Sequence, residues 1–499
     1  MTDAVRRADW RFLLGRPELG PVELRGGDDE LAAAVDALAG RGPGPGGDGG
    51  GVVAVPHDRA ALREAAAHVP PDGWLWAELG GWHRRSSWID DVRRAGLSDV
   101  TPHWLWPTAA APTRIVPLTA PAAVELALTR QGRGGPVARV LARALASSGL
   151  CRLVVRDVGV VASRSPGAAR GLEAWLEASR HRFGLDAAAG PLSCLYLTPR
   201  FRASASVIVL VTAGRDAAPR LVVKLPRHRD QDAGLAREAA GLGAAAERGL
   251  DRDGSAPRLV THEQPAALGG WPVLVETALR GPALRPAVVR RRPEAAITAV
   301  DSWLQRLAGG AERRPGEERV ARLLTGPLEP LAAIGAPERA LVDRTLAVCR
   351  PLEAAVLPEV LEHGDLSHPN LIALGGGRVG AVDWELAESR GLPLQDLAFF
   401  LAYVAGATRR ARTPDDHEAA VRAVEAETTR RLRRHATAVG VPEALVAPLV
   451  AASWARQAAA AWRRTGGQDP LWLRSSRVAR LWRRSVEVAE EEVACASST

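Results

Sequence analysis

The chain has 499 residues, more than one hydrophobic core usually supports, so we expect two or three domains. Hydrophobic residues make up 46% and charged residues 24%, which is typical of a soluble globular protein. The net charge is +8, but the basic residues are interleaved with 57 acidic ones and form no long block, so we expect no nucleic-acid partner.

The cysteines and the chain start bear on the compartment. Four cysteines stand far apart, and none forms a CxxC pair or a zinc spacing, so reduced thiols are expected. The first residues, MTDAVRRADWRFLL, lack the apolar core of a signal peptide, and no run of about 18 apolar residues occurs. We therefore expect a cytoplasmic protein without a membrane partner. The oligomeric state stays open, with a dimer as one option.

Residues 1–165 predict an α/β domain. A Gly/Pro-rich loop is expected over residues 40–51, GRGPGPGGDGGG, and strands and helices alternate after it. The expected strands are 51–56, 73–80, 99–107 and 151–162, and the expected helices are 58–69, with Asp58 as N-cap, and 87–96, with Gly96 at its end. The pattern breaks at SRSPGAARG, near residue 165.

Three short strands, 192–201, 206–214 and 220–226, predict an antiparallel meander in a second region, 166–282. A helix over 230–249 and a strand over 271–279 follow. Residues 283–499 read as mostly helical, interrupted at 361–387, with three helices expected over 414–491. The tryptophans of this last stretch favour a helical core over base stacking; they are Trp454, Trp462, Trp472 and Trp482.

Two residue types occur once each. Lys224 is the sole lysine and Asn370 the sole asparagine of a chain in which 64 of the 65 basic residues are arginine. Such a bias is typical of a GC-rich genome. Because a guanidinium is planar and larger than an ammonium, a lysine that survives this bias is a candidate for a position where arginine does not fit. A chance survivor remains an alternative.

The stretch HGDLSHPN, residues 363–370, carries the strongest chemical signal. Asp365 is followed by Asn370, and thirteen residues later Asp383 ends an apolar strand after a glycine-rich hairpin turn. A strand, a loop and a strand would bring these three side chains together. Carboxylate and amide oxygens are ligands that Mg²⁺ accepts, and magnesium suggests nucleotide phosphates. Glu238, on the helix after Lys224, would hold that ammonium against the phosphates.

From about residue 190 to 495 the chain resembles the aminoglycoside phosphotransferase and choline kinase family, small-molecule relatives of the protein kinases. The resemblance lies in HGDLSHPN, AVDWE and LPLQDLAFF, in this order and spacing. It implies a two-lobed protein-kinase-like domain with a mostly helical C-lobe, ATP and Mg²⁺ as cofactors, and transfer of phosphate to a hydroxyl of a small molecule such as an aminoglycoside, a sugar or an amino alcohol. The helices after residue 400 would form the acceptor pocket.

The resemblance also implies residue roles. Asp365 would be the catalytic aspartate, His363 would shape the catalytic loop, and Asp396 would brace that loop through backbone hydrogen bonds. The metal ligands would be Asn370 and Asp383. The nucleotide would be bound by Lys224, Glu238, the backbone near Glu276 and Ala278, and the loop TPRFRASAS with Ser204 and Ser206. That loop lacks the glycines expected there, so its small residues would have to allow the phosphates to approach.

The stretch from PPDGWLWAELG to WLWP resembles the second half of a class I methyltransferase, which implies a degenerate Rossmann-like domain over 1–165. We expect a truncated scaffold that binds no S-adenosylmethionine, because its glycines follow no apolar strand. Two alternatives to the phosphotransferase stay open: a nucleotide-binding scaffold without turnover, and a bifunctional methyltransferase–kinase.

Overall fold

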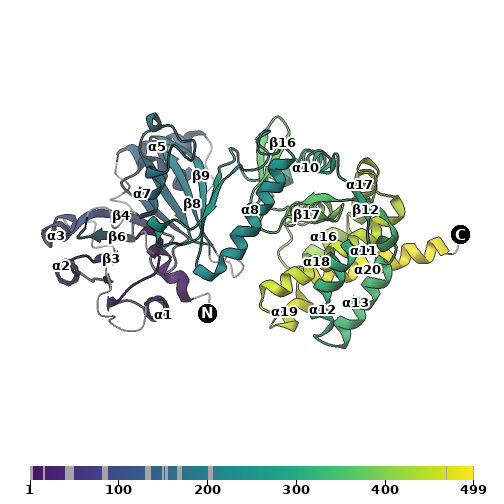
Figure 1. The fold of residues 1–499 in the computed structure, drawn as a ribbon, viewed down its shortest axis with the longest axis horizontal. Coiled ribbons are helices and arrows are strands. Elements are labelled where there is room, and N and C mark those ends of the chain that lie inside the picture. The colour runs from purple at the N-terminus through teal and green to yellow at the C-terminus, as the bar shows by residue number, and fades with distance from the viewer. Residues whose placement is uncertain are drawn as a thin grey trace. The chain divides into compact units, whose positions relative to one another are not determined.

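The structure is a computed structural model of the chain. It describes residues 4–14, 17–39, 50–80, 88–129, 136–148, 151, 155–165, 171–199, 206–467 and 469–497. Two compact units are present: unit 1 contains Met1–Leu235 and Leu259–Ala278, and unit 2 contains Ala236–Arg258 and Leu279–Thr499. Figure 1 shows the two units with their elements labelled.

Unit 1 is built on one sheet of eleven strands in the order β1-β2-β3-β6-β4-β5-β7-β8-β9-β11-β10. The strands are β1 (Val22–Arg25), β2 (Gly51–Ala54), β3 (Trp74–Leu79), β4 (Ser98–Trp106), β5 (Arg114–Pro117), β6 (Val158–Ser163), β7 (Leu192–Leu197), β8 (Ser206–Ala213), β9 (Asp216–Pro226), β10 (Leu259–Glu263) and β11 (Val273–Thr277). The pairs β1–β2 and β2–β3 are parallel and the other pairs are antiparallel.

The sheet crosses the boundary expected at residue 165. Strand β5 of the N-terminal region pairs with β7, with Ile115 opposite Tyr196, so the strands on both sides of residue 165 share one hydrogen-bonded sheet. The meander β7-β8-β9 has the predicted antiparallel order. Only the first three strands of the sheet are parallel, and the rest of it is antiparallel. The likeness to a methyltransferase and the boundaries at 165 and 282 stay predictions.

Helices cover both faces of this sheet. They are η1 (Ala4–Leu13), α1 (Asp29–Leu38), α2 (Arg59–Ala67), α3 (Trp88–Arg94), α4 (Pro121–Thr129), α5 (Pro136–Ser148) and α7 (Gly171–Ala178). Residues of η1, α1 and α7 share one buried cluster with Val53 and Val223, and residues of α2, α3 and α4 share another with Val52 and Leu210. Because successive strand residues face opposite sides, the sheet separates two cores.

The N-terminal segment is tied to the sheet by buried ion pairs. Arg7 donates to both carboxylate oxygens of Glu78 on β3, at 2.6 Å each. Asp9 accepts from Arg227, just after β9, at 2.8 Å, and Arg11 donates to the Arg227 carbonyl at 2.6 Å. Burial of such pairs is unfavourable unless each charge is compensated, and here hydrogen bonds provide that compensation. The segment before β1 is therefore an integral part of unit 1.

Unit 2 is mainly helical. The long helix α8 (Asp232–Glu247) belongs to it from Ala236 onward. The others are α9 (Pro286–Arg291), α10 (Pro293–Ala308), α11 (Glu317–Val320), η6 (Ala321–Thr325), α12 (Gly326–Ala332), α13 (Ala336–Cys349), α14 (Pro351–Ala354), α15 (Gln395–Arg409), α16 (Pro414–Arg422), α17 (Glu425–Ala438), α18 (Val446–Arg464), α19 (Pro470–Ser475) and α20 (Arg477–Ser497). Helix α18 packs against α12, α13, α15 and α20 (Figure 1).

Three small antiparallel sheets complete unit 2. Strand β12 (Arg313–Pro315) pairs with β13 (Val356–Pro358), β14 (Val360–Glu362) with β17 (Glu388–Gly391), and β15 (Leu371–Gly375) with β16 (Arg378–Ala381). The last pair is the predicted glycine-turn hairpin. Strands β15 and β16 and the end of β14 lie in the interruption predicted at 361–387, whereas β12, β13 and β17 lie outside it.

Several local predictions meet the structure directly. Asp58 caps α2 by accepting from the Ala61 N–H, and Gly96, beyond α3, has φ 82°, both as predicted. Residues 414–491 do not form three helices: they span α16 to α20, because turns at Gly440 and Gly466 and a break before Arg477 divide them. Strand β6 starts only at Val158.

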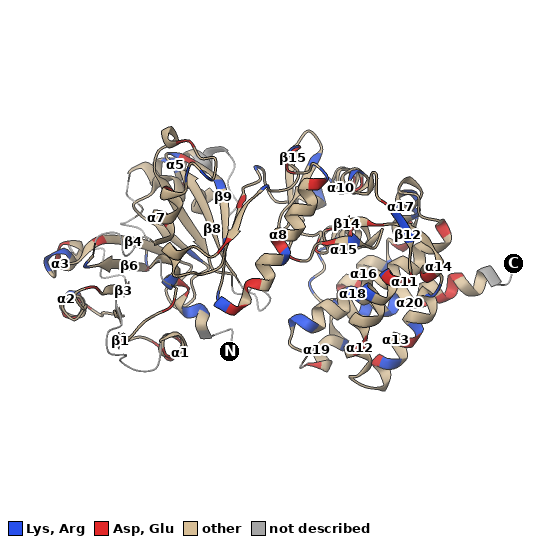
Figure 2. Cartoon of the chain, in the orientation of Figure 1, with Lys and Arg blue, Asp and Glu red and all other residues tan. Residues whose placement is uncertain are grey.

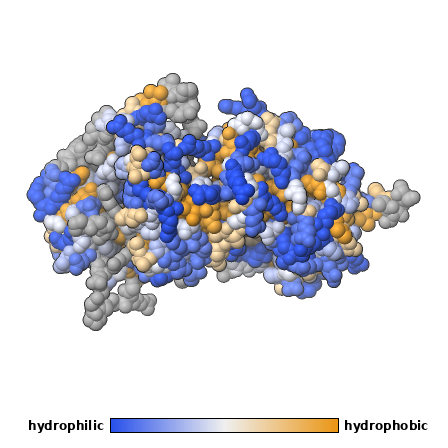
Figure 3. All heavy atoms as spheres, turned by 45° about the horizontal axis from the view of Figure 1, so that its top comes forward, coloured by the Kyte–Doolittle hydropathy of each residue, from blue (hydrophilic) through white to orange (hydrophobic). Residues whose placement is uncertain are grey.

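The predicted burial of the tryptophans holds for Trp454, Trp462 and Trp482, whereas Trp472 is 42% exposed. The four cysteines are free, as expected. Both signs of charge are spread through the described elements of each unit (Figure 2), and hydrophilic residues cover much of the face drawn in Figure 3. None of the described helices is both long enough and apolar enough to cross a membrane.

Candidate functional site

The loop between β14 and β15 presents Asp365. The side-chain Nδ2 of Asn370 donates to Asp365 Oδ2 and to the Asp365 carbonyl, both at 3.1 Å. Ser367 Oγ lies 3.5 Å from Asp365 Oδ1, at the limit of a hydrogen bond. One carboxylate oxygen is thus held in place, and Oδ1 is the oxygen best placed to accept a proton from another molecule.

His363 is fully buried and braces this loop from inside. Its Nε2 lies 3.0 Å from the Val382 carbonyl, and its Nδ1 accepts the Asp365 N–H at 3.3 Å. These contacts fit a neutral imidazole that is protonated at Nε2. Its ring packs on Trp384 with centroids 4.8 Å apart. Both ring nitrogens are engaged by the backbone, so His363 shapes the loop, which supports the role expected for it.

Asp396 anchors the start of the loop from helix α15. Its carboxylate accepts the His363 N–H at 2.7 Å and the Gly364 N–H at 2.9 Å, which confirms the predicted brace. Burial, and next the nearby carboxylate of Glu362, raise the pKa of Asp396 to about 7. The side chain therefore carries its charge only near and above neutral pH.

A buried polar network supports the same loop. Glu362 accepts from Arg456 Nη1 at 2.6 Å, from the Leu392 N–H at 3.1 Å, and from Gln395. Gln457, next to Arg456 on α18, donates to the Gly364 carbonyl at 2.7 Å. The sequence analysis missed these residues, because helix α18 lies almost a hundred residues further along the chain.

Gly364 occupies a position that requires glycine. Its φ is +83°, and a Cβ there would lie 2.4 Å from the Leu386 carbonyl oxygen. Side chains rarely adopt this backbone conformation, and a backbone atom cannot move aside as a flexible side chain can. The residue before Asp365 is thus pressed against the segment that follows Asp383.

The hairpin brings Asp383 to the loop. Leu371 pairs with Ala381, and the Val382 N–H donates to the Asn370 carbonyl at 2.9 Å, so Asn370 lies opposite Val382, the residue before Asp383. Asp383 has a φ of 71°. Glu238 on α8 accepts the N–H of the next residue, Trp384, at 3.3 Å. The hairpin thus brings the backbone of Asp383 close to Asn370, whose side chain contacts Asp365, and a shared site of the three side chains stays a prediction.

The chemistry of this pair fits Mg²⁺. The Nδ2 group of Asn370 donates to Asp365, so the amide oxygen Oδ1 is the atom of Asn370 that could bind a metal ion. Asp383 offers a carboxylate. Mg²⁺ is commonly held by one or two protein oxygens with waters and phosphates as its other ligands. Among the described residues no group of three or more His, Cys, Asp or Glu side chains could hold a metal alone.

The predicted nucleotide residues on the sheet lie in unit 1. Lys224 on β9 is 6% exposed and stands between Ile208 of β8 and Leu274 of β11. Glu276 is buried on β11, whereas the Ala278 N–H donates to the Arg220 carbonyl at 3.0 Å and is not available to adenine. Ser206 begins β8, and Ser204 lies outside the described residues. The pairing of Lys224 with Glu238 stays a prediction.

A cavity of about 710 Å³ lies in unit 2 beside the catalytic loop. Ser367 and His368 of the loop line it together with residues of α9, α15, α16, α18 and α20. Its arginine and histidine lining residues are Arg290, Arg410, Arg412, Arg477, His368 and His417, and the Tyr403 hydroxyl group also belongs to a lining residue. We call it the arginine pocket. The sequence predicts an acceptor pocket from helices after residue 400, but it did not single out these side chains.

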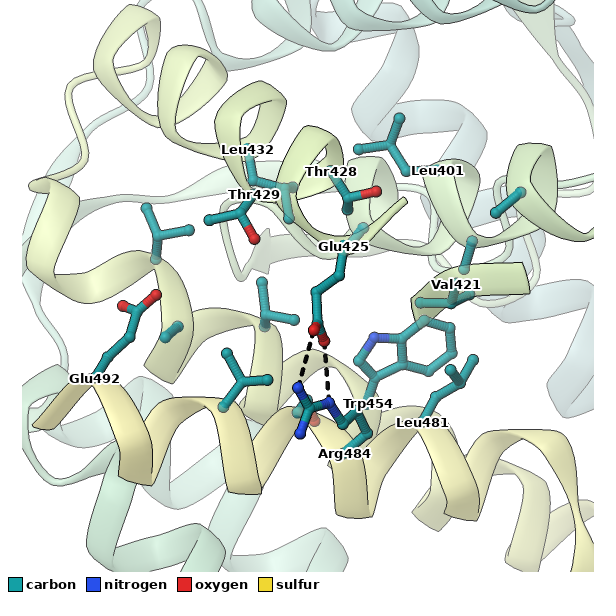
Figure 4. Close-up of a pocket in the computed structure, with 18 residues that line it drawn as sticks. Leu401, Val421, Glu425, Thr428, Thr429, Leu432, Trp454, Leu481, Arg484 and Glu492 are labelled. Atoms are coloured by element: carbon teal, nitrogen blue, oxygen red, sulfur yellow. Dashed lines mark hydrogen bonds and ion pairs between the residues drawn. The ribbon is translucent and has the colours of Figure 1, made fainter. Parts of the chain in front are cut away.

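A smaller, largely apolar cavity of about 80 Å³ lies behind the arginine pocket and shares Val421, Trp454 and Leu481 with it. Figure 4 shows this cavity, with Glu425 of α17 turned toward Arg484 of α20. Their ion pair has contacts of 2.9 and 3.0 Å. Glu492, the other charged lining residue, pairs with Arg433 at 3.1 Å, so each charged side chain that lines this cavity has an ion-pair partner.

Comparison with known proteins agrees with this geometry. Residues 200–435 match the sequence model of the phosphotransferase enzyme family (APH), a range that contains the catalytic loop, Asp383 and Asp396. The match supports a phosphotransferase domain within this range and the enzyme class of small-molecule phosphotransferase. A comparison with curated proteins gives no match.

Solved structures with partial similarity include a putative aminoglycoside phosphotransferase from Ralstonia eutropha JMP134, at 16% identity and a TM-score of 0.41, covering 64% of this chain and 98% of the other. A thermostable mutant of aminoglycoside phosphotransferase APH(4)-Ia with ADP and hygromycin B has 15% identity, a TM-score of 0.41, and coverages of 63% and 98%. Choline kinase LicA from Streptococcus pneumoniae has 13% identity and a TM-score of 0.37, and the match covers 57% of this chain and 89% of the other. These TM-scores are below 0.5, so the assignment rests on the family match.

Proposed function

We propose that the chain transfers the γ-phosphoryl group of ATP, with Mg²⁺, to a hydroxyl of a small molecule. The observation that carries the proposal is the geometry around Asp365. One of its oxygens is fixed by Asn370, its loop is anchored by Asp396, and Asp383 directly follows Val382, whose N–H donates to the Asn370 carbonyl. Catalysis of this type depends mainly on positioning and on electrostatics.

Each residue has a specific task in this proposal. Asp365 Oδ1 orients the acceptor hydroxyl and accepts its proton. Asn370 Oδ1 and the Asp383 carboxylate would hold Mg²⁺, which when bound offsets negative charge on the phosphates. Lys224 would contact the phosphates, with Glu238 as its partner. The Glu238 carboxylate also accepts the Trp384 N–H, and so couples α8 to the segment that carries Asp383.

The alternatives predict different results with the full chain. Purified protein is incubated with ATP, Mg²⁺ and sets of sugars, amino alcohols and aminoglycosides, and ADP release is measured. Acceptor-dependent ADP release supports the phosphotransferase. Tight ATP binding without release under any acceptor would favour the nucleotide-binding scaffold. Calorimetric titration with S-adenosylmethionine tests the bifunctional alternative, for which saturable binding is required.

Asp365→Asn provides the residue-level test. Loss of the base should lower acceptor-dependent turnover by about 10²- to 10⁴-fold while the Kd for ATP stays unchanged. Asp343→Asn, at an exposed position on α13, is the matched control and should behave as the unmodified protein. Normal turnover of the Asp365 variant would refute the assigned role.

A further inference from the structure

The arginine pocket has an unusual charge balance. Four arginines and two histidines line it, and no aspartate or glutamate does. Burial, and next Arg477, lower the pKa of His417, while burial, and next Arg285, lower the pKa of His368. Both imidazoles are therefore neutral at pH 7, and the positive charge of the pocket comes from its arginines.

The four arginines differ from their neighbours in lacking acidic partners. On the same helix α20, Arg480 pairs with Asp415 and Glu418, and Arg484 pairs with Glu425. Within the described ranges, neither Arg477 nor any of Arg290, Arg410 and Arg412 has an ion pair with a carboxylate. Arg290 reaches only a backbone carbonyl, that of Ala407, at 3.5 Å.

Arg477 links the arginine pocket to the catalytic loop. It is half-buried at the start of α20. Burial lowers the pKa of its guanidinium, and the Asp365 carboxylate acts on it in the opposite direction, so the two side chains are near enough to interact. A partly desolvated cation without a fixed partner is costly, and an anion that enters the pocket would remove that cost.

We propose that the acceptor is an anionic hydroxyl compound, with a phosphate group that the arginine pocket binds while its hydroxyl faces Asp365. This inference rests on the proposed phosphotransferase function and adds the chemical class of its substrate. Guanidinium groups bind phosphate with paired, charge-assisted hydrogen bonds, and several arginines around one cavity suit a dianion. The same pocket repels aminoglycosides and amino alcohols, which carry positive charge.

The bias of the chain toward arginine does not account for this pocket. That bias explains why its basic residues are arginines instead of lysines. It does not explain why acids are missing from the lining, since the chain has 57 of them and they pair with arginines immediately around the pocket. The local absence of carboxylates is therefore a property of the site.

The test uses two series of related hydroxyl compounds whose members are neutral, cationic, carboxylated or phosphorylated. The full chain, with ATP and Mg²⁺, receives glycerol, 3-amino-1,2-propanediol, glycerate and glycerol 3-phosphate, and in a second set glucose, glucosamine, gluconate and glucose 6-phosphate. ADP release gives kcat/KM for each. We expect the phosphorylated member to exceed the neutral and amino members by about tenfold or more. A preference for the amino or neutral members, or for the carboxylates over the phosphates, would overturn the proposal.

Variants then locate the effect. Arg477→Gln and Arg410→Gln should each raise KM for the phosphorylated acceptor by about 10- to 100-fold and leave KM for ATP unchanged. Their controls are Arg483→Gln, exposed on the same helix, and Arg409→Gln, exposed beside Arg410, which remove the same charge outside the pocket. Arg410 is exposed, so its variant keeps the test valid if Arg477→Gln fails to fold. Equal effects of pocket and control variants would contradict the proposal.

A binding measurement separates this inference from the proposed function. If calorimetry detects no ATP binding, the phosphotransferase proposal fails, and the substrate class with it. If ATP binds and neutral or cationic acceptors react best, only the substrate class fails. If ATP binds but no compound of either set reacts, inorganic phosphate is titrated with ADP saturating. Binding that Arg477→Gln weakens about tenfold supports the pocket, and absence of binding refutes it.

Discussion

The side-chain amide of Asn370 donates to Asp365 Oδ2 at 3.1 Å, and its oxygen is the atom left for a metal. Two substitutions separate these tasks. Asn370→Asp keeps an oxygen ligand but sets a second carboxylate against Asp365, so kcat should fall about 100-fold with little change in the Mg²⁺ concentration for half-maximal rate. Asn370→Ala should lower kcat and in addition raise the Mg²⁺ concentration for half-maximal rate. Magnesium titrations of both variants provide the measurement, and identical Mg²⁺ dependence would show that Asn370 is no metal ligand.

Gly364 provides a second prediction. In Gly364→Ala the new Cβ meets the Leu386 carbonyl oxygen at 2.4 Å, so the loop must shift and Asp365 with it. Turnover should drop by at least about 100-fold, since catalysis tolerates little displacement of the reacting groups. Gly376→Ala is the matched control: its φ is also positive, +58°, but nothing lies within 4 Å of its Cβ. It should cost about 1 kcal/mol of stability and leave kcat intact. Similar kinetics of the two variants would contradict this account.

Asp396 should make stability depend on pH. Its pKa is about 7 in the folded protein against 3.8 as its ordinary value, so between about pH 4 and pH 7 the folded state holds a proton that the unfolded chain has released. Its contribution to stability therefore falls as pH rises through this window, by at most about 1.4 kcal/mol per pH unit. Asp396→Asn does not titrate there. The unfolding free energy of the unmodified protein minus that of the variant, from urea melts at pH 5, 6 and 7, should decline; a constant difference would count against the shift.

Arg456 holds the buried carboxylate of Glu362 at 2.6 Å. Arg456→Met should lower the free energy of unfolding by about 3–5 kcal/mol, because it leaves that charge without its partner. Adding Glu362→Gln should recover part of the loss, which a double-mutant cycle measures. Arg463→Met, about two turns further along α18, serves as control and should have a smaller effect. If adding Glu362→Gln lowers the free energy of unfolding further, the two residues are not an ion pair that stabilises the loop.

The catalytic loop could be predicted because its parts are close in sequence. Asp365, Asn370 and Asp383 lie within nineteen residues, and one glycine-turn hairpin brings the backbone of Asp383 close to Asn370. Asp396 follows shortly after and binds the loop as expected. Short loops leave few alternative arrangements, so a local pattern suffices. The meander that carries Lys224 could be predicted for the same reason.

Contacts between residues far apart in the chain could not be predicted from the sequence. Arg477 and Arg456 reach the loop from helices about a hundred residues away, and among 64 arginines neither stands out. The Ala278 N–H donates to the carbonyl of Arg220 on the neighbouring strand, a contact that residue spacing in the sequence does not reveal. The sequence predicts three helices over 414–491 where five occur, because short breaks divide them, at Gly440 and Gly466 and also at Ala423–Val424 and Ser476, where no glycine stands.

The eleven-stranded sheet has a consequence for how this enzyme can be dissected. Removing residues 1–165 would expose the edge of β7, whose N–H and C=O groups could then pair with strands of other molecules. It would also remove Asp9, the ion-pair partner of Arg227. A shortened catalytic fragment is thus expected to aggregate on expression. The N-terminal third thus covers the edge of β7, and a shorter phosphotransferase fragment would need that edge protected in another way.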